Sequence, residues 1–304
     1  MKKYYGVIPP IITPIDENEN VDERGFRNLL RHCIDKGLHG IFVAGTNGET
    51  MALTQQQREN AIRIALDEVG GAIPVMAGVM DTSTRRVIDN IKRLEQMGGS
   101  CAVVTPIFYA RHVNQDETKR HFEKIARESN IDILIYSIPA FTGLSLSFET
   151  IEYLSKMDHV VGYKDSSGNF PDFIKCLMYF KGKNFCLLQG STPLAAASML
   201  MGADGFIPSI SPLFPSLFIA LYEAGKSGNI SRTMELNELI AETSAILMMS
   251  KNQISANKCA LSRLGLTDKR VIFPLDPVSC EEEKKIFTAV DMIMIKMKEL
   301  GLPV

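Results

Sequence analysis

Lys164 is the side chain in this sequence with the most evident capacity for chemistry. It follows the largely apolar run 159–163 and precedes the polar, glycine-containing stretch 165–169. Such a run is typical of a buried parallel strand, so the lysine is expected where a sheet meets a loop. Burial disfavours an ammonium ion, and the resulting neutral amine can attack a ketone to form a Schiff base. The alternative is a lysine that merely reaches solvent at the end of its strand.

The elements that must position this lysine alternate regularly along the chain. Strands are expected at 7–12, 40–44, 73–77, 101–105, 133–138, 159–164, 185–189 and 205–209. Helices are expected between them, and their N-caps at Asp22, Thr54, Thr84, Asn114 and Ser147. This order predicts the α/β class and a (β/α)8 TIM barrel. A doubly wound sheet, the main alternative, more often has fewer strands and a glycine-rich first turn.

The strand pattern mostly stops at about residue 215. Segments near 215–225, 231–249, 256–264 and 281–300 are helix-like. We therefore expect a barrel over residues 1–225 and a C-terminal helical appendage over 226–304.

Two further groups are expected beside Lys164, because the C-terminal ends of barrel strands converge on one site. Thr46, Asn47 and Gly48 offer a hydroxyl, an amide and free backbone N–H groups that can hold a carboxylate. Tyr136 ends the neighbouring strand, where a phenol can exchange a proton with an alkoxide. An ordinary turn and an ordinary strand tyrosine are the alternatives. Together the three features suit a 2-oxo acid bound covalently through its ketone.

Composition excludes several other classes of function. The net charge of −2 gives no reason to expect nucleic acid or a membrane surface as a partner. The six cysteines include no CxxC pair and the five histidines no HExxH motif, which favours free thiols in a reducing cytoplasm and no metal site. Two prolines interrupt the apolar N-terminal stretch, so neither a signal peptide nor a transmembrane span is expected there. A cytoplasmic location follows as an expectation.

Four ordered motifs carry a resemblance to a known family: Pro10-x-x-Thr13-Pro14, Gly45-Thr46-Asn47-Gly48-Glu49, Tyr136-x-x-Pro139-x-x-Thr142-Gly143 and Gly162-x-Lys164-Asp165. The chain resembles, over essentially its whole length, the dihydrodipicolinate synthase and N-acetylneuraminate lyase superfamily of Schiff-base enzymes. The resemblance implies a (β/α)8 barrel with a C-terminal helical region, usually assembled as a homotetramer. It also implies that no metal or organic cofactor is needed, since the protonated imine is the electron sink.

The resemblance also assigns roles to individual residues. Lys164 would form the imine with pyruvate or a related 2-oxo acid, and Tyr136 would shuttle protons. Thr46 and Asn47 would bind the carboxylate, and the backbone carbonyl of Ile207 would face the reacting centre. The remaining residues expected to line the substrate site are Gly48, Tyr109, Phe141, Gly190 and Ser191.

Three departures bear on the choice of substrate. Phe141 stands where the synthase branch has an arginine that binds the second substrate's carboxylate. Asn47 replaces a hydroxyl residue of the proton relay, and Phe108 replaces the tyrosine supplied to a neighbouring subunit, although Tyr109 lies next to it. These departures count against 4-hydroxy-tetrahydrodipicolinate synthase, which nevertheless stays open as an alternative.

The motifs look closest to the 4-hydroxy-2-oxoglutarate and 2-keto-3-deoxy-sugar-acid aldolases. The leading hypothesis is therefore cleavage of a 4-hydroxy-2-oxo acid into pyruvate and an aldehyde. N-acetylneuraminate lyase is a further alternative, although Ser191 stands where that branch usually has acidic residues. Dehydration of a sugar acid, and a non-catalytic 2-oxo acid sensor, also stay open.

Overall fold

The computed structural model describes residues 2–304 and divides the chain into two compact units. The first unit combines the N-terminal residues up to Tyr5 with Pro74–Ile207. The second combines Gly6–Ile73 with Pro208–Val304. Within each unit strands and helices follow one another as the sequence predicts. The proposed boundary between residues 225 and 226 stays a prediction.

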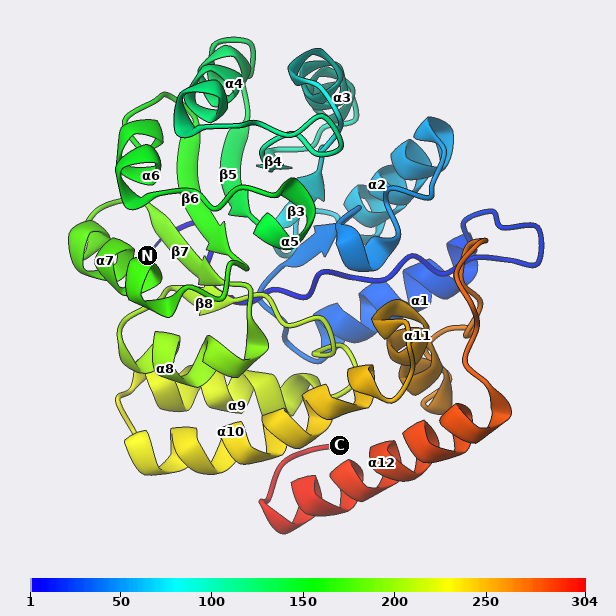
Figure 1. The fold of residues 1–304 in the computed structure, drawn as a ribbon. Helices are drawn as coiled ribbons and strands as arrows, with labels where there is room; N and C mark the ends of the chain where they lie inside the picture. The colour runs from blue at the N-terminus through cyan, green and yellow to red at the C-terminus, as the bar shows by residue number, and fades with distance from the viewer. Residues whose placement is uncertain (1) are drawn as a thin grey trace. The chain divides into compact units, whose positions relative to one another are not determined.

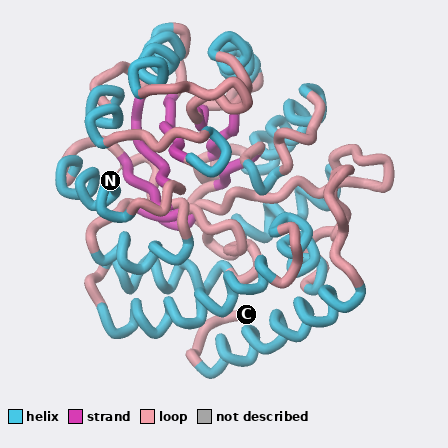
Figure 2. Tube along the Cα trace, in the orientation of Figure 1, coloured by secondary structure: helices cyan, strands magenta, loops and turns pink. Residues whose placement is uncertain are grey.

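Six strands form the framework of the first unit, and consecutive strands pair in parallel. They are β3 (Val75–Gly78), β4 (Cys101–Val104), β5 (Asp132–Ser137), β6 (Val160–Asp165), β7 (Cys186–Gln189) and β8 (Gly205–Phe206). The helices of this unit are α3 (Thr84–Gln96), α4 (Gln115–Arg127), α5 (Pro139–Thr142), α6 (Phe148–Leu154), α7 (Phe170–Phe180) and α8 (Ala195–Leu200), with the 3-10 turn η2 at Thr192–Leu194. Helices α4, α6 and α7 lie outside strands β5–β7 (Figures 1 and 2).

The second unit contains two short strands and most of the long helices. They are β1 (Gly6–Val7), α1 (Glu23–Asp35), β2 (Ile41–Val43), the 3-10 turn η1 (Thr46–Gly48) and α2 (Gln55–Val69) in the N-terminal segment. The C-terminal segment supplies α9 (Pro215–Lys226), α10 (Ile230–Ala245), the 3-10 turn η3 (Ile246–Met248), α11 (Gln253–Arg263) and α12 (Cys280–Glu299). A parallel bridge joins Pro10 to Phe42, so the chain after β1 runs beside β2.

The expected elements are present, with differences at their ends that have physical causes. Strands β1 and β8 are shorter than predicted, because Pro9, Pro10 and Pro208 have no N–H to donate to a ladder. The prediction of Thr84 as an N-cap is wrong: the hydroxyl of Ser83 accepts from Arg86 N and caps α3. Thr84 becomes the first helical residue, and its hydroxyl pairs with His121 Nδ1 at 2.9 Å. The short helix α5 was not predicted.

All six cysteines are free, and five of them are buried. No helix within residues 2–304 combines the length and the apolar character that crossing a bilayer requires.

Candidate active site

Lys164 lies near the C-terminal end of β6, a strand that is paired on both of its sides. Its register partners are Tyr136 on β5 and Leu188 on β7. The side chain of Lys164 is almost fully enclosed, with only 3% of the residue exposed. The sequence-based expectation of a lysine buried where the sheet ends is therefore confirmed, and the solvated alternative is wrong.

Burial changes the acid–base behaviour of this amine. Removing the ammonium ion from water lowers the pKa of Lys164 from 10.5 to about 7. About half of the molecules then carry a neutral amine at pH 7, against roughly 0.03% for an ordinary lysine. An amine in this state is a nucleophile toward ketones and aldehydes.

Tyr136 lies directly beside this amine. Lys164 Nζ lies 3.8 Å from the centroid of the Tyr136 ring, and Tyr136 is itself 3% exposed. Neighbouring parallel strands in register bring the two side chains together, as the sequence predicted for adjacent strand ends. The ring face stabilises the protonated form of the lysine. The role of the phenol in proton transfer stays a prediction.

Gly190 makes room for the lysine side chain. A Cβ at this position would lie 2.1 Å from Ser166 Oγ, 2.8 Å from Asp165 O and 3.1 Å from Lys164 Cε, so any larger residue would clash. Gly190 N also donates to Asp165 O at 2.6 Å. Ser191 follows, half-buried, with its N–H donating to Gln189 Oε1 at 2.8 Å. Gly190 is thus placed against Lys164, and its role in binding substrate stays a prediction.

Asp165 is a buried acid that the sequence-based reasoning left without a role. Successive strand residues face opposite sides of a sheet, so its side chain points away from that of Lys164. Its Oδ1 accepts hydrogen bonds from Tyr163 Oη and from Ser167 N, both at 3.0 Å. Burial raises the pKa of this carboxyl. Asp165 fixes the loop that follows the reactive strand, and its position directly after the lysine was the available signal.

The aromatic residues expected in the substrate site, Tyr109 and Phe141, are exposed. Tyr109 is 93% exposed and has a φ of +69°, and Phe141 on α5 is 56% exposed. Phe108 is half-buried, and Ile207 is buried with its N–H donating to Gln189 O at 2.8 Å. The structure gives neither Tyr109 nor Phe141 a contact with Lys164, and their substrate-binding roles stay predictions.

Arg111 brings a guanidinium group to α5. A Cβ on Gly143, the residue that ends α5, would lie 2.5 Å from Arg111 Cδ and 2.8 Å from its Nη1. The arginine side chain therefore passes directly over this glycine, two residues after Phe141. Sequence reasoning missed this residue, because nothing local connects residue 111 with residue 143.

The expected carboxylate cradle lies in the second unit. Thr46, Asn47 and Gly48 form the 3-10 turn η1, as a strand-to-helix turn of this composition suggests. Thr13 Oγ1 donates to Gly48 O at 2.8 Å and fixes the turn against the segment after β1. A Cβ on Gly48 would lie 3.2 Å from both Ile11 O and Thr13 Oγ1, so glycine fits best there. That this turn faces Lys164 stays a prediction.

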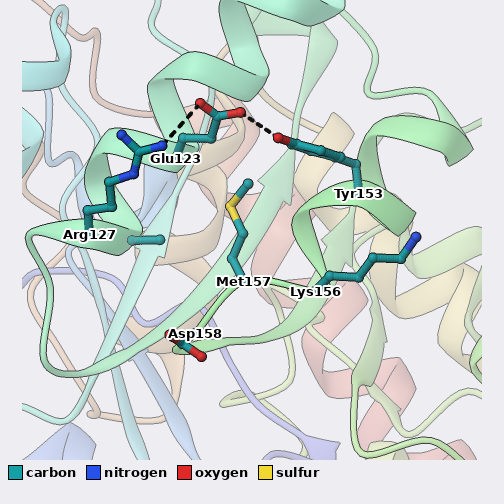
Figure 3. A pocket seen from close by; sticks show the side chains of 7 residues that line it. Glu123, Arg127, Tyr153, Lys156, Met157 and Asp158 are labelled. Atoms are coloured by element: carbon teal, nitrogen blue, oxygen red, sulfur yellow. Dashed lines mark hydrogen bonds and ion pairs between the residues drawn. The ribbon is translucent and has the colours of Figure 1, made fainter.

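A pocket of about 270 Å³ opens between α4 and α6, at the opposite end of β6 from Lys164. In Figure 3, Glu123 accepts from the hydroxyl of Tyr153 at 2.7 Å and faces Arg127 at 3.9 Å. Asp158 lines the same pocket and lies two residues before β6 begins at Val160, whereas Lys164 lies near the other end of this strand. Because the pocket lies at the other end of β6 from Lys164, it is not the reactive centre. Within residues 2–304 no group of three or more His, Cys, Asp or Glu side chains could hold a metal ion.

This chain is similar in structure and in sequence to known dihydrodipicolinate synthases. The structure matches dihydrodipicolinate synthase from Bacteroides thetaiotaomicron with a TM-score of 0.91 and 28% identity, covering 96% of this chain and 99% of that one. The Acinetobacter baumannii synthase, solved with pyruvate, matches with a TM-score of 0.90 and 26% identity over 96% and 99% of the two chains. Among curated proteins, 4-hydroxy-tetrahydrodipicolinate synthase of Methanopyrus kandleri is 31% identical over 98% of this chain and 96% of its own.

Fold and site together define a (β/α)8 TIM-barrel enzyme with a C-terminal helical region, of the Schiff-base-forming, pyruvate-dependent lyase class. The chain belongs to the dihydrodipicolinate synthetase family, whose sequence model matches residues 3–293. Enzymes of this family hold pyruvate as an imine on a lysine and use no metal or organic cofactor. The fold, the enzyme class and the family resemblance inferred from the sequence are confirmed. The alternative of a non-catalytic sensor is wrong.

Proposed function

We propose that Lys164 holds pyruvate as an imine and that the enzyme makes or breaks a carbon–carbon bond between this pyruvate and an aldehyde. The observation that carries the proposal is the buried amine, with its pKa lowered to about 7 and its nitrogen 3.8 Å from the Tyr136 ring centroid. The neutral amine attacks C2 of the ketone, and loss of water gives the protonated imine. That imine draws electrons from C3, so C3 loses a proton or a bonded aldehyde carbon to give an enamine.

Tyr136 and the turn Thr46–Gly48 have complementary roles in the proposal. The phenol of Tyr136 would give a proton to, or take one from, the oxygen that becomes the aldehyde carbonyl. Thr46 and Asn47 would bind the carboxylate of the 2-oxo acid through a hydroxyl and backbone N–H groups. The support for this cradle is the fixed, glycine-dependent shape of the turn.

Aspartate semialdehyde is the first candidate for the aldehyde, which would make the enzyme a 4-hydroxy-tetrahydrodipicolinate synthase. The names of the similar curated proteins favour this candidate over the keto-deoxy-sugar-acid aldolase preferred from the sequence. Arg111 adds support, because it brings a guanidinium group to α5, where the synthase branch uses an arginine at the position of Phe141. A guanidinium there can bind the carboxylate of the second substrate.

A second candidate is cleavage of a 4-hydroxy-2-oxo acid such as 4-hydroxy-2-oxoglutarate. Phe141 favours it, since an exposed apolar ring replaces the synthase arginine on α5. Asn47 and Phe108 favour it too, because both remove hydroxyl groups from the relay expected of a synthase.

Borohydride trapping tests the common step of both candidates. Wild-type enzyme incubated with pyruvate and borohydride should gain one reduced adduct on the peptide that contains Lys164, and Lys164→Ala should gain none. Trapping or turnover retained in Lys164→Ala would refute the assignment. Two parallel assays then separate the candidates: condensation of pyruvate with aspartate semialdehyde, and release of pyruvate from 4-hydroxy-2-oxo acids, keto-deoxy sugar acids and N-acetylneuraminate. Activity in one assay names the aldehyde class, and silence in both favours dehydration.

From the family we also propose that the enzyme acts on a small molecule, that it assembles as a homotetramer and that it is located in the cytoplasm. Size-exclusion chromatography with light scattering tests the assembly, since a monomer or a dimer in solution would contradict the tetramer.

A further inference from the structure

Glu49 directly follows the turn Thr46–Gly48 and has an uncommon backbone conformation. Its φ of +54° lies in the left-handed region, which residues other than glycine seldom occupy. Its N–H donates to Thr46 O at 3.1 Å, so this conformation closes the turn. A residue held in this region needs surrounding contacts that keep it there.

Those contacts converge on the buried carboxylate of Glu49. Lys258 Nζ lies 2.5 Å from Glu49 Oε2, and the two side chains are 0% and 1% exposed. The N–H of Ile272 donates to Glu49 Oε1 at 2.8 Å. Lys258 belongs to α11 and Ile272 to the segment between α11 and α12, so two C-terminal segments hold one carboxylate next to the cradle.

Stability alone is a weak explanation for this ion pair. Removing two opposite charges from water costs about as much as their attraction returns, and buried pairs can often be replaced by apolar residues without loss. Two apolar side chains at positions 49 and 258 would pack α11 against the chain after β2 equally well. What an ion pair adds is a defined geometry, because each buried charge is left unpaired unless the two side chains meet.

We propose that Lys258 is a positioning residue that acts through Glu49 to fix the turn Thr46–Gly48 in the orientation that binds the substrate carboxylate. This inference rests on the proposed function, since it assumes that the turn binds the carboxylate of a 2-oxo acid. Lys258 does not touch the substrate. Its effect should therefore appear only with ketones that carry a carboxylate.

Pyruvate and methyl pyruvate form the matched pair of probes. Both carry the ketone that Lys164 attacks, and only pyruvate has the carboxylate. In Lys258→Met we expect the KM for borohydride trapping to rise by about 10- to 100-fold for pyruvate. This is the size of effect expected when the substrate carboxylate loses charge-assisted hydrogen bonds to the turn Thr46–Gly48. For methyl pyruvate the KM should stay within about twofold, and Lys258→Arg should restore part of the loss with pyruvate. An equal loss with both ketones, or no loss with pyruvate, would overturn the inference.

Two further variants keep the test decisive. Lys258→Met leaves a buried carboxylate unpaired, so the double variant Glu49→Gln/Lys258→Met, which removes both charges, should show the same selective loss if the single variant does not fold. Lys269→Met is the matched control, because Lys269 pairs with Glu283 on α12 and is 44% exposed; both ketones should react as in wild type. If wild-type enzyme is not trapped by pyruvate, the proposed function fails. If it is trapped but the variants treat both ketones alike, this inference alone fails.

Discussion

Replacing Lys164 by methionine should make the protein more stable while abolishing its reactivity. The amine is enclosed beside Tyr136, and burial lowers its pKa from 10.5 to about 7. Below pH 7 the folded protein must carry a buried ammonium ion, whereas the unfolded chain carries a solvated one. Methionine has a similar length and no charge, so Lys164→Met removes this cost.

The size and the pH dependence follow from the two pKa values. The difference between 10.5 and about 7, at about 1.4 kcal/mol for each pH unit, gives about 5 kcal/mol as an upper value. Between pH 7 and 10.5 the unfolded chain binds the proton and the folded protein does not, so the stability of the wild type rises with pH across this window. The advantage of Lys164→Met is therefore full below pH 7 and falls to about 1.4 kcal/mol at pH 9.5.

Thermal unfolding at pH 6 and at pH 9.5 measures this advantage. For a chain of 304 residues each kcal/mol shifts Tm by roughly 1.5–2 °C, so Lys164→Met should melt up to about 7.5–10 °C above wild type at pH 6 and about 2–3 °C above it at pH 9.5. Lys124→Met, an exposed lysine of α4, is the control and should leave Tm unchanged at both pH values. A Lys164→Met protein no more stable than wild type at pH 6, or with the same gain at both pH values, would refute this account of the buried amine.

Three further outcomes follow from the site. In Tyr136→Phe, turnover should fall by about 10²–10⁴-fold while borohydride trapping persists, because the phenol moves protons and the amine forms the imine; unchanged turnover would remove that role. The rate of trapping by pyruvate should rise with pH through about 7 and then level off, as Lys164 loses its proton; a rate that keeps rising to pH 10 would indicate an ordinary lysine. In Thr46→Val, which keeps the shape and removes the hydroxyl, the KM for pyruvate should rise by roughly tenfold; an unchanged KM would exclude the hydroxyl as a carboxylate ligand.

The reactive end of β6 could be predicted from the sequence because its determinants are local. A continuous apolar run specifies a strand buried on both faces, and the polar, glycine-containing residues after it specify where the strand ends. A buried Lys164 was therefore the expectation at that junction, and Tyr136, at the end of the preceding strand, was expected beside it in a parallel sheet, as the register shows. Helix starts were predictable for the same reason, since a cap such as Thr54 bonds within its own first turn.

The residues that sequence reasoning missed depend on contacts between distant segments. Arg111 reaches Gly143 across two loops, and Lys258 meets Glu49 more than two hundred residues away along the chain. No periodicity or local motif encodes such pairs. The position of Tyr109 beside the missing tyrosine suggested a role, and because its ring is exposed in this chain, that role stays a prediction.

The two buried lysines, Lys164 and Lys258, differ in the groups that surround their amines. Burial lowers the pKa of both Lys164 and Lys258. At Lys258 the carboxylate of Glu49 opposes this lowering of the pKa, and the amine lies in a buried ion pair with that carboxylate. At Lys164 burial itself is the cause of the shift, and the neighbouring group is an aromatic ring whose attraction for a cation is much weaker. In the proposed function the same type of side chain is therefore a nucleophile at the end of β6, whereas on α11 it is one half of a buried ion pair. A carboxylate introduced beside Lys164, as in Leu188→Glu at its register partner on β7, should raise the pKa of Lys164 and slow trapping by pyruvate at pH 7, because register partners on neighbouring strands face the same side of the sheet.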